Sequence, residues 1–481
     1  MTYHLAIDIG ASSGRVILAD TSQGLELKEI HRFKNGFSFK NGHDRWNISF
    51  LVEEILTGLS KAKQAGVTEA TIGIDTWAVD YVLLDQDGKL LEEPIAYRDS
   101  RTQGAMEVFF QKVAKEEVYR KTGIQFLNFN TLYQLFVEDK EKLAQATDLL
   151  LIPDYLAYVL TGKKVGEVSN VSTTQYLNIH NRDYDADLLE VAGVERQLLP
   201  ELLETGQILG PIRSDLYQVY DLPQAQVVAV ATHDTASAVV GVPATTEDWA
   251  YISSGTWSLI GVENSQPLTS DAAFDANYTN EWGIYQTYRF LKNITGMWTV
   301  QEIARNLDYA YSFVEMAEQA SQVEPFLQFI NLNDDRFTNP DNMIAEIQAY
   351  CQETGQAVPG TVGELTMAVY SNLAMAYAHE WENLKSLTGR DLQVLHIVGG
   401  GSNVALLNQL TADLIGKPVI AGPGEGTALG NIMIQMIASK ELADLKEARQ
   451  WLESNQELIR FEPQARQGDQ LLAAYRAKVF N

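Results

Sequence analysis

Residues 5–20, LAIDIGASSGRVILAD, read as two apolar strands joined by a tight turn of small residues. The turn at residues 10–14 is rich in glycine, which permits positive φ, so its N–H groups can face an anion. Asp8 precedes the turn and Arg15 follows it. An acid, an N–H-rich turn and a guanidinium suit a metal-bound polyphosphate, with Asp8 facing the metal and Arg15 facing the phosphates. The stretch therefore predicts a phosphate-binding hairpin.

Two other interpretations of this stretch remain open. An N-terminal hairpin can be purely structural, with no ligand. The segment GASSG also matches the pattern G-x-S-x-G of serine hydrolases, in which a helix must follow the serine. Residues 15–18 instead continue as a β-rich run, which favours the hairpin over that nucleophile turn.

Composition bounds the class of protein. A chain of 481 residues exceeds one usual core, so two or three domains are expected. The net charge of −27 argues against a nucleic-acid partner bound through a broad basic face, and against an anionic membrane surface. Phosphate sites must then be local, built from backbone amides, a few basic residues and a metal.

The single cysteine, Cys351, excludes an intramolecular disulfide and fits a reducing compartment. We see no signal-peptide pattern and no run of about 20 apolar residues. These observations predict a cytoplasmic protein with no membrane partner.

The second half opens like the first. Residues 249–253 and 257–262 read as strands on either side of the small turn Ser254-Gly255-Thr256. This internal repeat, weak by identity, favours a mixed α/β fold with a boundary at 243–246. We therefore predict two domains, 1–243 and 244–481.

Two further segments carry candidate chemistry. Asp234 follows the apolar run 226–231 and lies between His233 and Thr235, which suits a carboxylate that accepts a proton from a sugar hydroxyl; the alternative is an N-cap aspartate for a helix at 235–240. The triple glycine 399–401 lies between a predicted strand and a helix that we expect Ser402 to cap. It allows a flat ring or a phosphate to lie against the backbone, although tight packing is the alternative. Neither G-x-G-x-x-G nor GxxxxGK[ST] is present.

The chain resembles the FGGY carbohydrate kinases over nearly its whole length. The motifs that carry the resemblance are DIGASSGR (8–15), GIDTW (73–77), YRDSR (97–101), THDTA (232–236), ISSGTW (252–257), LKNI (291–294) and VGGGS (398–402). The resemblance implies two ribonuclease-H-like (actin-like ATPase) domains around a central cleft. It places sugar, phosphates and the catalytic base in the N-terminal domain and the nucleotide in the C-terminal one.

The resemblance also implies ATP-dependent phosphorylation of L-rhamnulose at the 1-hydroxyl, with Asp234 as proton acceptor. The residues it assigns to ATP are Ala11, Ser12, Ser13, Gly14, Arg15, Thr256, Gln301 and Gly400. Those it assigns to the sugar are Ala78, His233, Asp234, Thr235 and Asn293. Asp8 is our candidate for Mg²⁺, which takes only one or two carboxylates. Ala78 stands where relatives commonly carry glycine, so its methyl group is expected to narrow the sugar site.

Several alternatives stay open at this point. Residue physics does not choose among L-rhamnulose, L-fuculose, xylulose, ribulose and glycerol. A non-catalytic, actin- or Hsp70-like nucleotide-dependent binding protein is the second class. We expect a monomer or a weak homodimer. Trp77 and Asp80 are further candidates to line the sugar site, although Trp77 can equally be a core residue. The polar segment 168–179 reads as an irregular substrate-facing loop.

Overall fold

The computed structural model describes residues 3–464 and 468–480. The chain forms two compact units, each of which contains segments distant in sequence. The first comprises Met1–Gly241, Glu263–Phe290 and Thr427–Asn455, and the second Val242–Val262, Leu291–Gly426 and Gln456–Asn481. The predicted division of roles between 1–243 and 244–481 is a different partition and stays a prediction.

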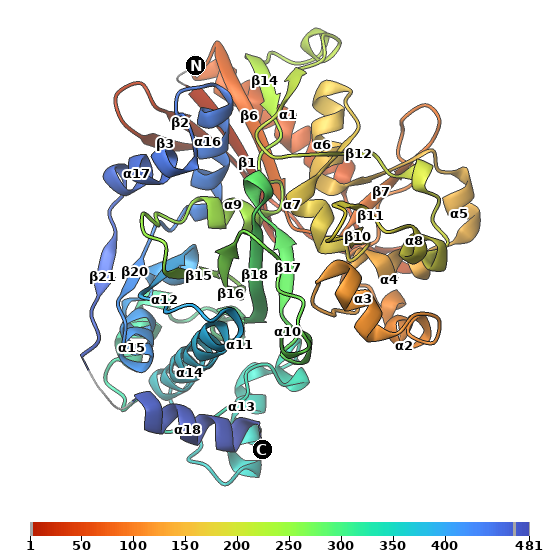
Figure 1. Cartoon of the computed structure of the whole chain (residues 1–481). Coiled ribbons are helices and arrows are strands. Elements are labelled where there is room, and N and C mark those ends of the chain that lie inside the picture. The colour runs from red at the N-terminus through yellow and green to blue at the C-terminus, as the bar shows by residue number, and fades with distance from the viewer. Residues whose placement is uncertain (1–2, 465–467, 481) are drawn as a thin grey trace. The chain divides into compact units, whose positions relative to one another are not determined.

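A six-stranded sheet with the order β13-β14-β6-β1-β2-β3 organises the first unit (Figure 1). Its strands are β1 (Tyr3–Ile9), β2 (Ser13–Asp20), β3 (Glu26–Lys34), β6 (Glu69–Thr76), β13 (Ile208–Pro211) and β14 (Gln224–Val228). β1, β2 and β3 form an antiparallel meander, whereas β14, β6 and β1 run parallel. The predicted hairpin is thus confirmed as the β1–β2 pair.

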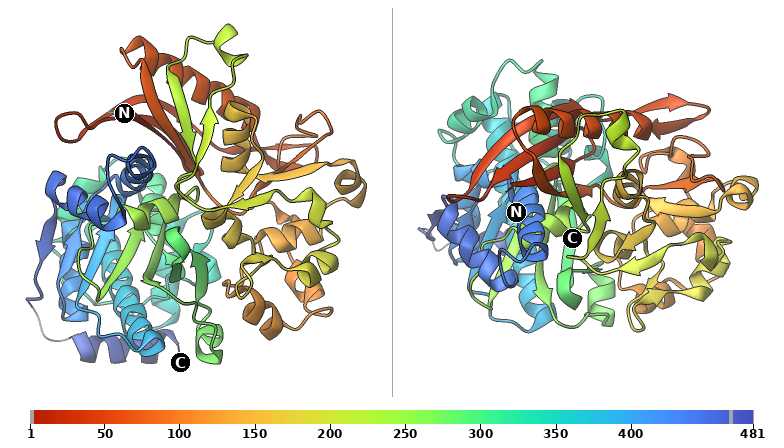
Figure 2. Two further views of the ribbon diagram at one scale, coloured as in Figure 1. Left: turned by 45° about the horizontal axis from the view of Figure 1, so that its top comes forward. Right: turned by 90° about the horizontal axis from the view of Figure 1, so that it is seen from above.

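Both faces of this sheet are apolar, and helices cover both. Leu5 and Ile7 of β1 pack with α1 (Ile48–Gln64) and α6 (Ile152–Thr161) in one buried cluster. Ala6, from the opposite face of the same strand, packs with α9 (Asp234–Val240) and α16 (Gly426–Ala438) in a second cluster. Because side chains alternate along a strand, the uninterrupted apolar run of β1 serves both faces. Figure 2 shows these strands, in red and orange with β14 in yellow-green, from two further directions.

Smaller elements complete the first unit. They are β4 (Phe37–Lys40), β5 (His43–Trp46), β7 (Tyr81–Leu84), α2 (Ala105–Phe109), α3 (Lys115–Thr122), α4 (Thr131–Phe136), α5 (Lys140–Gln145), β8 (Asp148–Leu151), β9 (Val165–Glu167), α7 (Val168–Val171), β10 (Leu177–Asn178), β11 (Asp183–Tyr184), α8 (Ala186–Ala192), β12 (Glu201–Leu203), α10 (Asp271–Asp275), β17 (Thr279–Trp282) and α17 (Leu445–Asn455). The prediction of an irregular loop at 168–179 is wrong, since this segment is buried and includes α7 and β10.

The second unit repeats the strand plan of the first. Its strands belong to a seven-stranded sheet with the order β17-β18-β16-β15-β19-β20-β21, and the six strands from β18 onward match β3-β2-β1-β6-β14-β13 position by position. These strands are β15 (Trp249–Ser254), β16 (Trp257–Asn264), β18 (Tyr288–Thr295), β19 (Val394–Val398), β20 (Val419–Ala421) and β21 (Ile459–Phe461). β15 pairs antiparallel with β16 and parallel with β19, as β1 does with β2 and β6. The internal repeat inferred from two hairpins therefore extends to whole sheets.

The helices of the second unit are α11 (Trp298–Asn306), α12 (Phe313–Ala320), α13 (Met343–Glu353), α14 (Val362–Thr388), α15 (Ala405–Ile415) and α18 (Gly468–Val479). A capping box formed by Thr361 and Glu364 begins α14. The expectation that Ser402 caps α15 is wrong: Val404 is the N-cap residue, and the Ser402 hydroxyl donates to Gly399 O at 2.7 Å. Among residues 3–464 and 468–480, no helix combines the length and apolar character that crossing a membrane requires.

Candidate active site

Three carboxylates gather where parallel strands of the first unit end. Asp8 on β1 lies beside Asp75 on β6, and Thr76 forms a bridge with His233, the residue before Asp234. Burial and the nearby Asp8 carboxylate raise the pKa of Asp75 well above its usual value. Burial likewise raises the pKa of Asp234, and Asp8 adds to that rise. The pKa shifts thus indicate that these acids share one electrostatic environment, the setting in which proton transfer is tuned.

Asp234 is the first residue of α9, and His233 is the N-cap, so the alternative of an N-cap aspartate does not hold. The Asp234 side chain is 32% exposed. Its Oδ1 accepts from the Thr235 backbone N at 2.6 Å and from Thr235 Oγ1 at 3.2 Å, and lies 3.5 Å from His233 Nε2. Among the described residues these contacts all involve Oδ1. Oδ2 takes part in none of these contacts.

A buried ion pair lies behind His233. His233 Nδ1 is 3.3 Å from Glu281 Oε2 on β17, and Arg289 on β18 pairs with the same oxygen at 2.9 Å. Burial alone would raise the pKa of Glu281, but Arg289 and His233 hold it below its usual value. The imidazole is therefore fixed between Glu281 and Asp234. Neither Glu281 nor Arg289 was a candidate from the sequence; the available signal was two charges in an otherwise uncharged β-rich segment.

Asp75 is a further residue that sequence reasoning missed. Its side chain is fully buried, and Oδ2 accepts from Asn431 Nδ2 at 2.6 Å. Oδ1 has no hydrogen-bond partner among the residues that the structure describes. A buried carboxylate oxygen without a donor is unfavourable unless a cation or a proton compensates it.

The hairpin turn places the predicted phosphate-binding residues at the end of β1. Ala11, Ser12 and Ser13 are exposed or half-buried, and Asn35, absent from our candidates, donates through its side chain to Gly10 O at 2.8 Å. Arg15 donates to Asp8 Oδ2 at 2.6 Å across the strand pair. These contacts tie the turn to residue 35 and place an acid and a guanidinium beside it.

Two details of the hairpin decide between its interpretations. A Cβ atom on Gly14 would lie 2.3 Å from the Phe33 ring, so this glycine is required by packing. Strand β2 begins at Ser13, and no helix follows Ser12. The hydrolase interpretation of GASSG is therefore wrong, because it requires a strand–turn–helix.

In the second unit, the corresponding turn carries neutral groups. Thr256 Oγ1 donates to Gln301 Oε1 at 3.4 Å, and Asn293 lies on β18. A Cβ on Gly399 or Gly401 would come within 2.8 Å or 2.0 Å of Ser254, so tight packing explains these two glycines. Gly400 is exposed, and its Cβ would meet nothing nearer than 3.9 Å. Of the three glycines, Gly400 is the one whose backbone is open to a ligand.

The three sugar-site candidates Ala78, Trp77 and Asp80 differ in burial. Ala78 is half-buried in the loop that follows β6, whereas Trp77 and Asp80 are 6% and 1% exposed. Burial favours the alternative that Trp77 is a core residue, and it leaves Asp80 little surface for a sugar. The first unit brings together Asp8, residues 11–15, Ala78 and residues 233–235.

Two repeated α/β units, one bearing clustered carboxylates beside a phosphate-type hairpin, define a two-domain kinase of the actin-like fold. Family models agree: residues 3–241 match the N-terminal domain, and residues 250–439 the C-terminal domain, of the FGGY family of carbohydrate kinases. The chain belongs to this family.

Relatives and solved structures extend the match. The chain is 53% identical to a rhamnulokinase of Ligilactobacillus salivarius, over 99% of this chain and 98% of the relative. It is also 53% identical to a rhamnulokinase of Bacillus subtilis, over 93% and 92%. A ligand-bound xylulose kinase from Lactobacillus acidophilus has a TM-score of 0.81 at 17% identity, covering 100% of this chain and 96% of that one. A glycerol kinase from Plasmodium falciparum with ADP has a TM-score of 0.78 at 17% identity, covering 99% and 97%. At that identity the structures show the fold alone.

Proposed function

We propose that this protein transfers the γ-phosphoryl group of ATP to the 1-hydroxyl of L-rhamnulose, giving L-rhamnulose 1-phosphate and ADP. The observation that carries the proposal is Asp234, a partly exposed carboxylate whose Oδ1 is fixed by Thr235 and His233. The proposed sugar is taken from relatives named rhamnulokinase, which are 53% identical over most of both chains. Family membership supplies the reaction type.

Asp234 acts as the general base. A sugar hydroxyl is a weak nucleophile, and its proton becomes acidic only as the oxygen bonds to phosphorus. Asp234 Oδ2 accepts that proton, while Thr235 and His233 keep the carboxylate in place. His233 is itself held by Glu281 and needs no part in the proton transfer.

The nucleotide is proposed to bind through both hairpins. The amides of residues 11–14 and the Arg15 guanidinium contact phosphates. Thr256 and Gln301 lie beside the nucleotide, and the exposed backbone of Gly400 lies against adenosine. Ala78, His233, Thr235 and Asn293 contact the sugar. These roles are supported by surface exposure, which is partial or full at Ala11, Ser12, Ser13, Arg15, Ala78, Thr256, Asn293, Gln301 and Gly400. Gly14, His233 and Thr235 are buried.

Mg²⁺ fits the acidic end of the first sheet. Asp75 Oδ1 is a buried oxygen without a donor among the described residues, and Asp8 lies beside it on the neighbouring strand. We propose that Asp8, directly or through water, holds the ion, with Asp75 supporting it. When bound, Mg²⁺ neutralises charge on the phosphates.

A coupled ADP-release assay tests this function. Purified protein with MgATP is screened over L-rhamnulose, L-fuculose, xylulose, ribulose and glycerol, and we expect the highest kcat/KM with L-rhamnulose. A higher value with another sugar would assign a different ketose or polyol kinase. ADP release that no sugar stimulates would favour the actin- or Hsp70-like binding protein.

Three further properties are proposals. We infer a cytoplasmic site of action, which the single, buried Cys351 supports. We also infer a monomer or weak homodimer. Sugar and ATP are the partners we assign, with neither nucleic acid nor membrane among them.

A further inference from the structure

We propose that Asp80 is a positioning residue whose carboxylate holds the loop at residues 77–80 in a strained conformation and so presents Ala78 to the sugar. The proposal rests on the proposed function, because it takes Ala78 as a sugar contact. The loop directly follows Thr76, which bridges to His233 beside the general base. The conformation of this loop therefore shapes the part of the site that lies next to Asp234.

Val79 carries the strain. Its φ is +69°, a left-handed value that a β-branched residue adopts only at appreciable cost. The Asp80 backbone N donates to Ala78 O at 3.0 Å, so the chain makes a tight γ-turn centred on Val79. Such a turn persists only where surrounding contacts determine it. It also sets the direction in which Ala78 faces.

The Asp80 carboxylate supplies those contacts from inside the loop. Oδ2 accepts from Trp46 Nε1 at 2.6 Å, from Trp77 Nε1 at 2.9 Å and from the Tyr97 backbone N at 3.2 Å. Oδ1 accepts from Gln134 Nε2 at 3.1 Å. The two indole rings lie 4.3 Å apart between centroids. Asp80 thus ties both ends of the turn to a buried aromatic wall.

Burial raises the pKa of Asp80 to about 6, and the donors from Trp77, Trp46 and Gln134 oppose that rise. At neutral pH the group is therefore largely ionised although it is buried. With 1% exposure it has no access to the sugar, so any effect on the substrate must pass through the loop.

Helix α4 holds the turn from the other side. Thr131 Oγ1 donates to Val79 O at 2.7 Å, and Gln134 Nε2 donates to the same oxygen at 3.2 Å. Arg101 donates to Gln134 Oε1 at 2.9 Å. Because a guanidinium only donates, this contact fixes which end of the Gln134 amide faces the loop.

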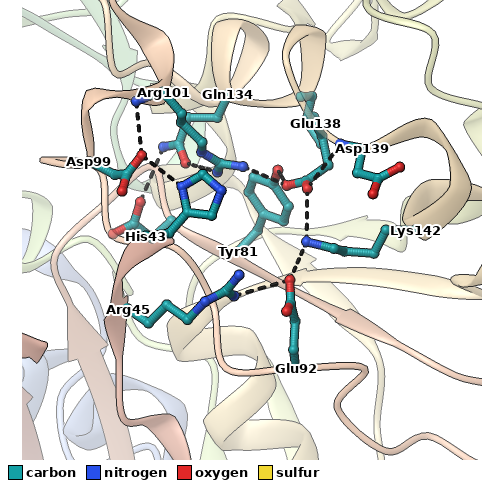
Figure 3. A network of polar contacts seen from close by, with 12 residues as sticks. His43, Arg45, Tyr81, Glu92, Asp99, Arg101, Gln134, Glu138, Asp139 and Lys142 are labelled. Atoms are coloured by element: carbon teal, nitrogen blue, oxygen red, sulfur yellow. Dashed lines mark hydrogen bonds and ion pairs between the residues drawn. The ribbon is translucent and has the colours of Figure 1, made fainter. Parts of the chain in front are cut away.

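The Gln134 contact belongs to a wider network of polar side chains, shown in Figure 3. Arg101 pairs with Glu138 at 2.7 Å, and Tyr81 donates to the same carboxylate oxygen at 2.5 Å. Lys142 joins Glu138 at 3.2 Å. The network therefore fixes the Gln134 side chain through Arg101, and Gln134 in turn contacts the strained turn.

The test separates loop positioning from general stability. In Asp80→Asn, an NH₂ group replaces one acceptor oxygen in a site filled by N–H donors. We expect the KM for the sugar to rise by about tenfold, with kcat within about threefold of wild type and the KM for ATP unchanged. Adding Val79→Gly should return the sugar KM toward wild type, because glycine takes positive φ without a Cβ penalty. Adding Val79→Ala, which removes almost the same side chain but keeps Cβ, should not.

Asp185→Asn is the matched control. Asp185 is a buried aspartate of the same unit whose contacts are Lys121, Asn178 and the α8 N-terminus. We expect this variant to leave both KM values unchanged. All measurements use the sugar that the wild-type protein turns over best. An error in the proposed substrate is then detected with the wild-type protein alone, and it does not affect the comparison of the variants.

Two results overturn the proposal. One is an Asp80→Asn enzyme whose kcat falls while both KM values rise alike. The other is equal behaviour of the Val79→Gly and Val79→Ala double variants. If Asp80→Asn fails to fold, Val79→Gly and Val79→Ala are each combined with Gln134→Met instead. Gln134→Met removes the amide donors to Val79 O and Asp80 Oδ1. In that background, equal behaviour of the two double variants, or a fall in kcat with an equal rise in both KM values, overturns the proposal.

Discussion

The two hairpins of this molecule share a strand plan but differ in charge. The β1–β2 pair sets Asp8 opposite Arg15, whereas β15–β16 sets Ser253 opposite Leu259. On the neighbouring parallel strand, Asp75 lies beside Asp8, but Val398 lies beside Ser253. One copy of the plan therefore carries charges suited to phosphate and proton transfer. The other offers small neutral groups suited to an uncharged ring.

The turns differ as well. Between the paired residues Ile9 and Gly14 lie residues 10–13, whereas only residues 255–257 lie between Ser254 and Ser258. The longer turn adds one more backbone N–H at the charged end. The two sheets thus share one strand order, and we propose that their two turns have separate tasks, which the following predictions examine.

The largest expected change in rate follows from a substitution in the first unit. Asp234→Asn keeps the size of the side chain but removes the proton acceptor, and loss of a general base typically costs about 10²–10⁴ in rate. We expect kcat to fall by at least about 10², with the sugar dissociation constant changed much less. Steady-state assays and sugar titration measure the two quantities. Near-normal turnover would move the base elsewhere, and Asp8 would be tested next.

A smaller change, in the KM for ATP, is expected from a substitution in the second unit. In Gly400→Val the side chain fills the face that we assign to adenosine, so the KM for ATP should rise by about tenfold while the sugar KM stays unchanged. Gly360→Val is the control, since Gly360 is exposed in the same unit and its Cβ would also have room. Equal increases in both KM values would contradict the assignment of Gly400.

The smallest effect concerns pH. Asp234 must be ionised to act as base, and its pKa is raised by burial, so kcat falls as the pH drops through that raised pKa. The Thr235 hydroxyl bond to Oδ1 favours the ionised form. Thr235→Val removes it and should move the acidic limb of the kcat profile to higher pH, by at most about one unit. A limb that moves to lower pH would show that another group controls it.

Local patterns predicted the parts of the fold that depend on local physics. In α1 the apolar residues recur at helical spacing, and the face that they form is buried. The small-residue turns predicted both hairpins, because β-rich runs flank them. Segment 168–179 was predicted wrongly: its polar composition indicated exposure, but long-range packing buries it.

The candidate site was predictable only where a motif marked it. Asp234 stands between His233 and Thr235 after an apolar run, and that context is visible in the sequence. Asp75 acquires its environment from parallel pairing of β6 with β1, and Glu281 meets His233 from a distant strand. Asp80 was a candidate to line the sugar site, yet its carboxylate is buried and accepts hydrogen bonds from two indole N–H groups. These contacts depend on topology, which spacing along the chain does not encode.

The division of tasks between the two units is tested most directly by a crossed binding titration. Isothermal calorimetry measures ADP and L-rhamnulose binding to Asp234→Asn and Gly400→Val. The account predicts that Asp234→Asn binds ADP like wild type, and that Gly400→Val binds L-rhamnulose like wild type but ADP about tenfold more weakly. Weaker ADP binding by Asp234→Asn, or sugar binding weakened by Gly400→Val as much as ADP binding, would contradict it.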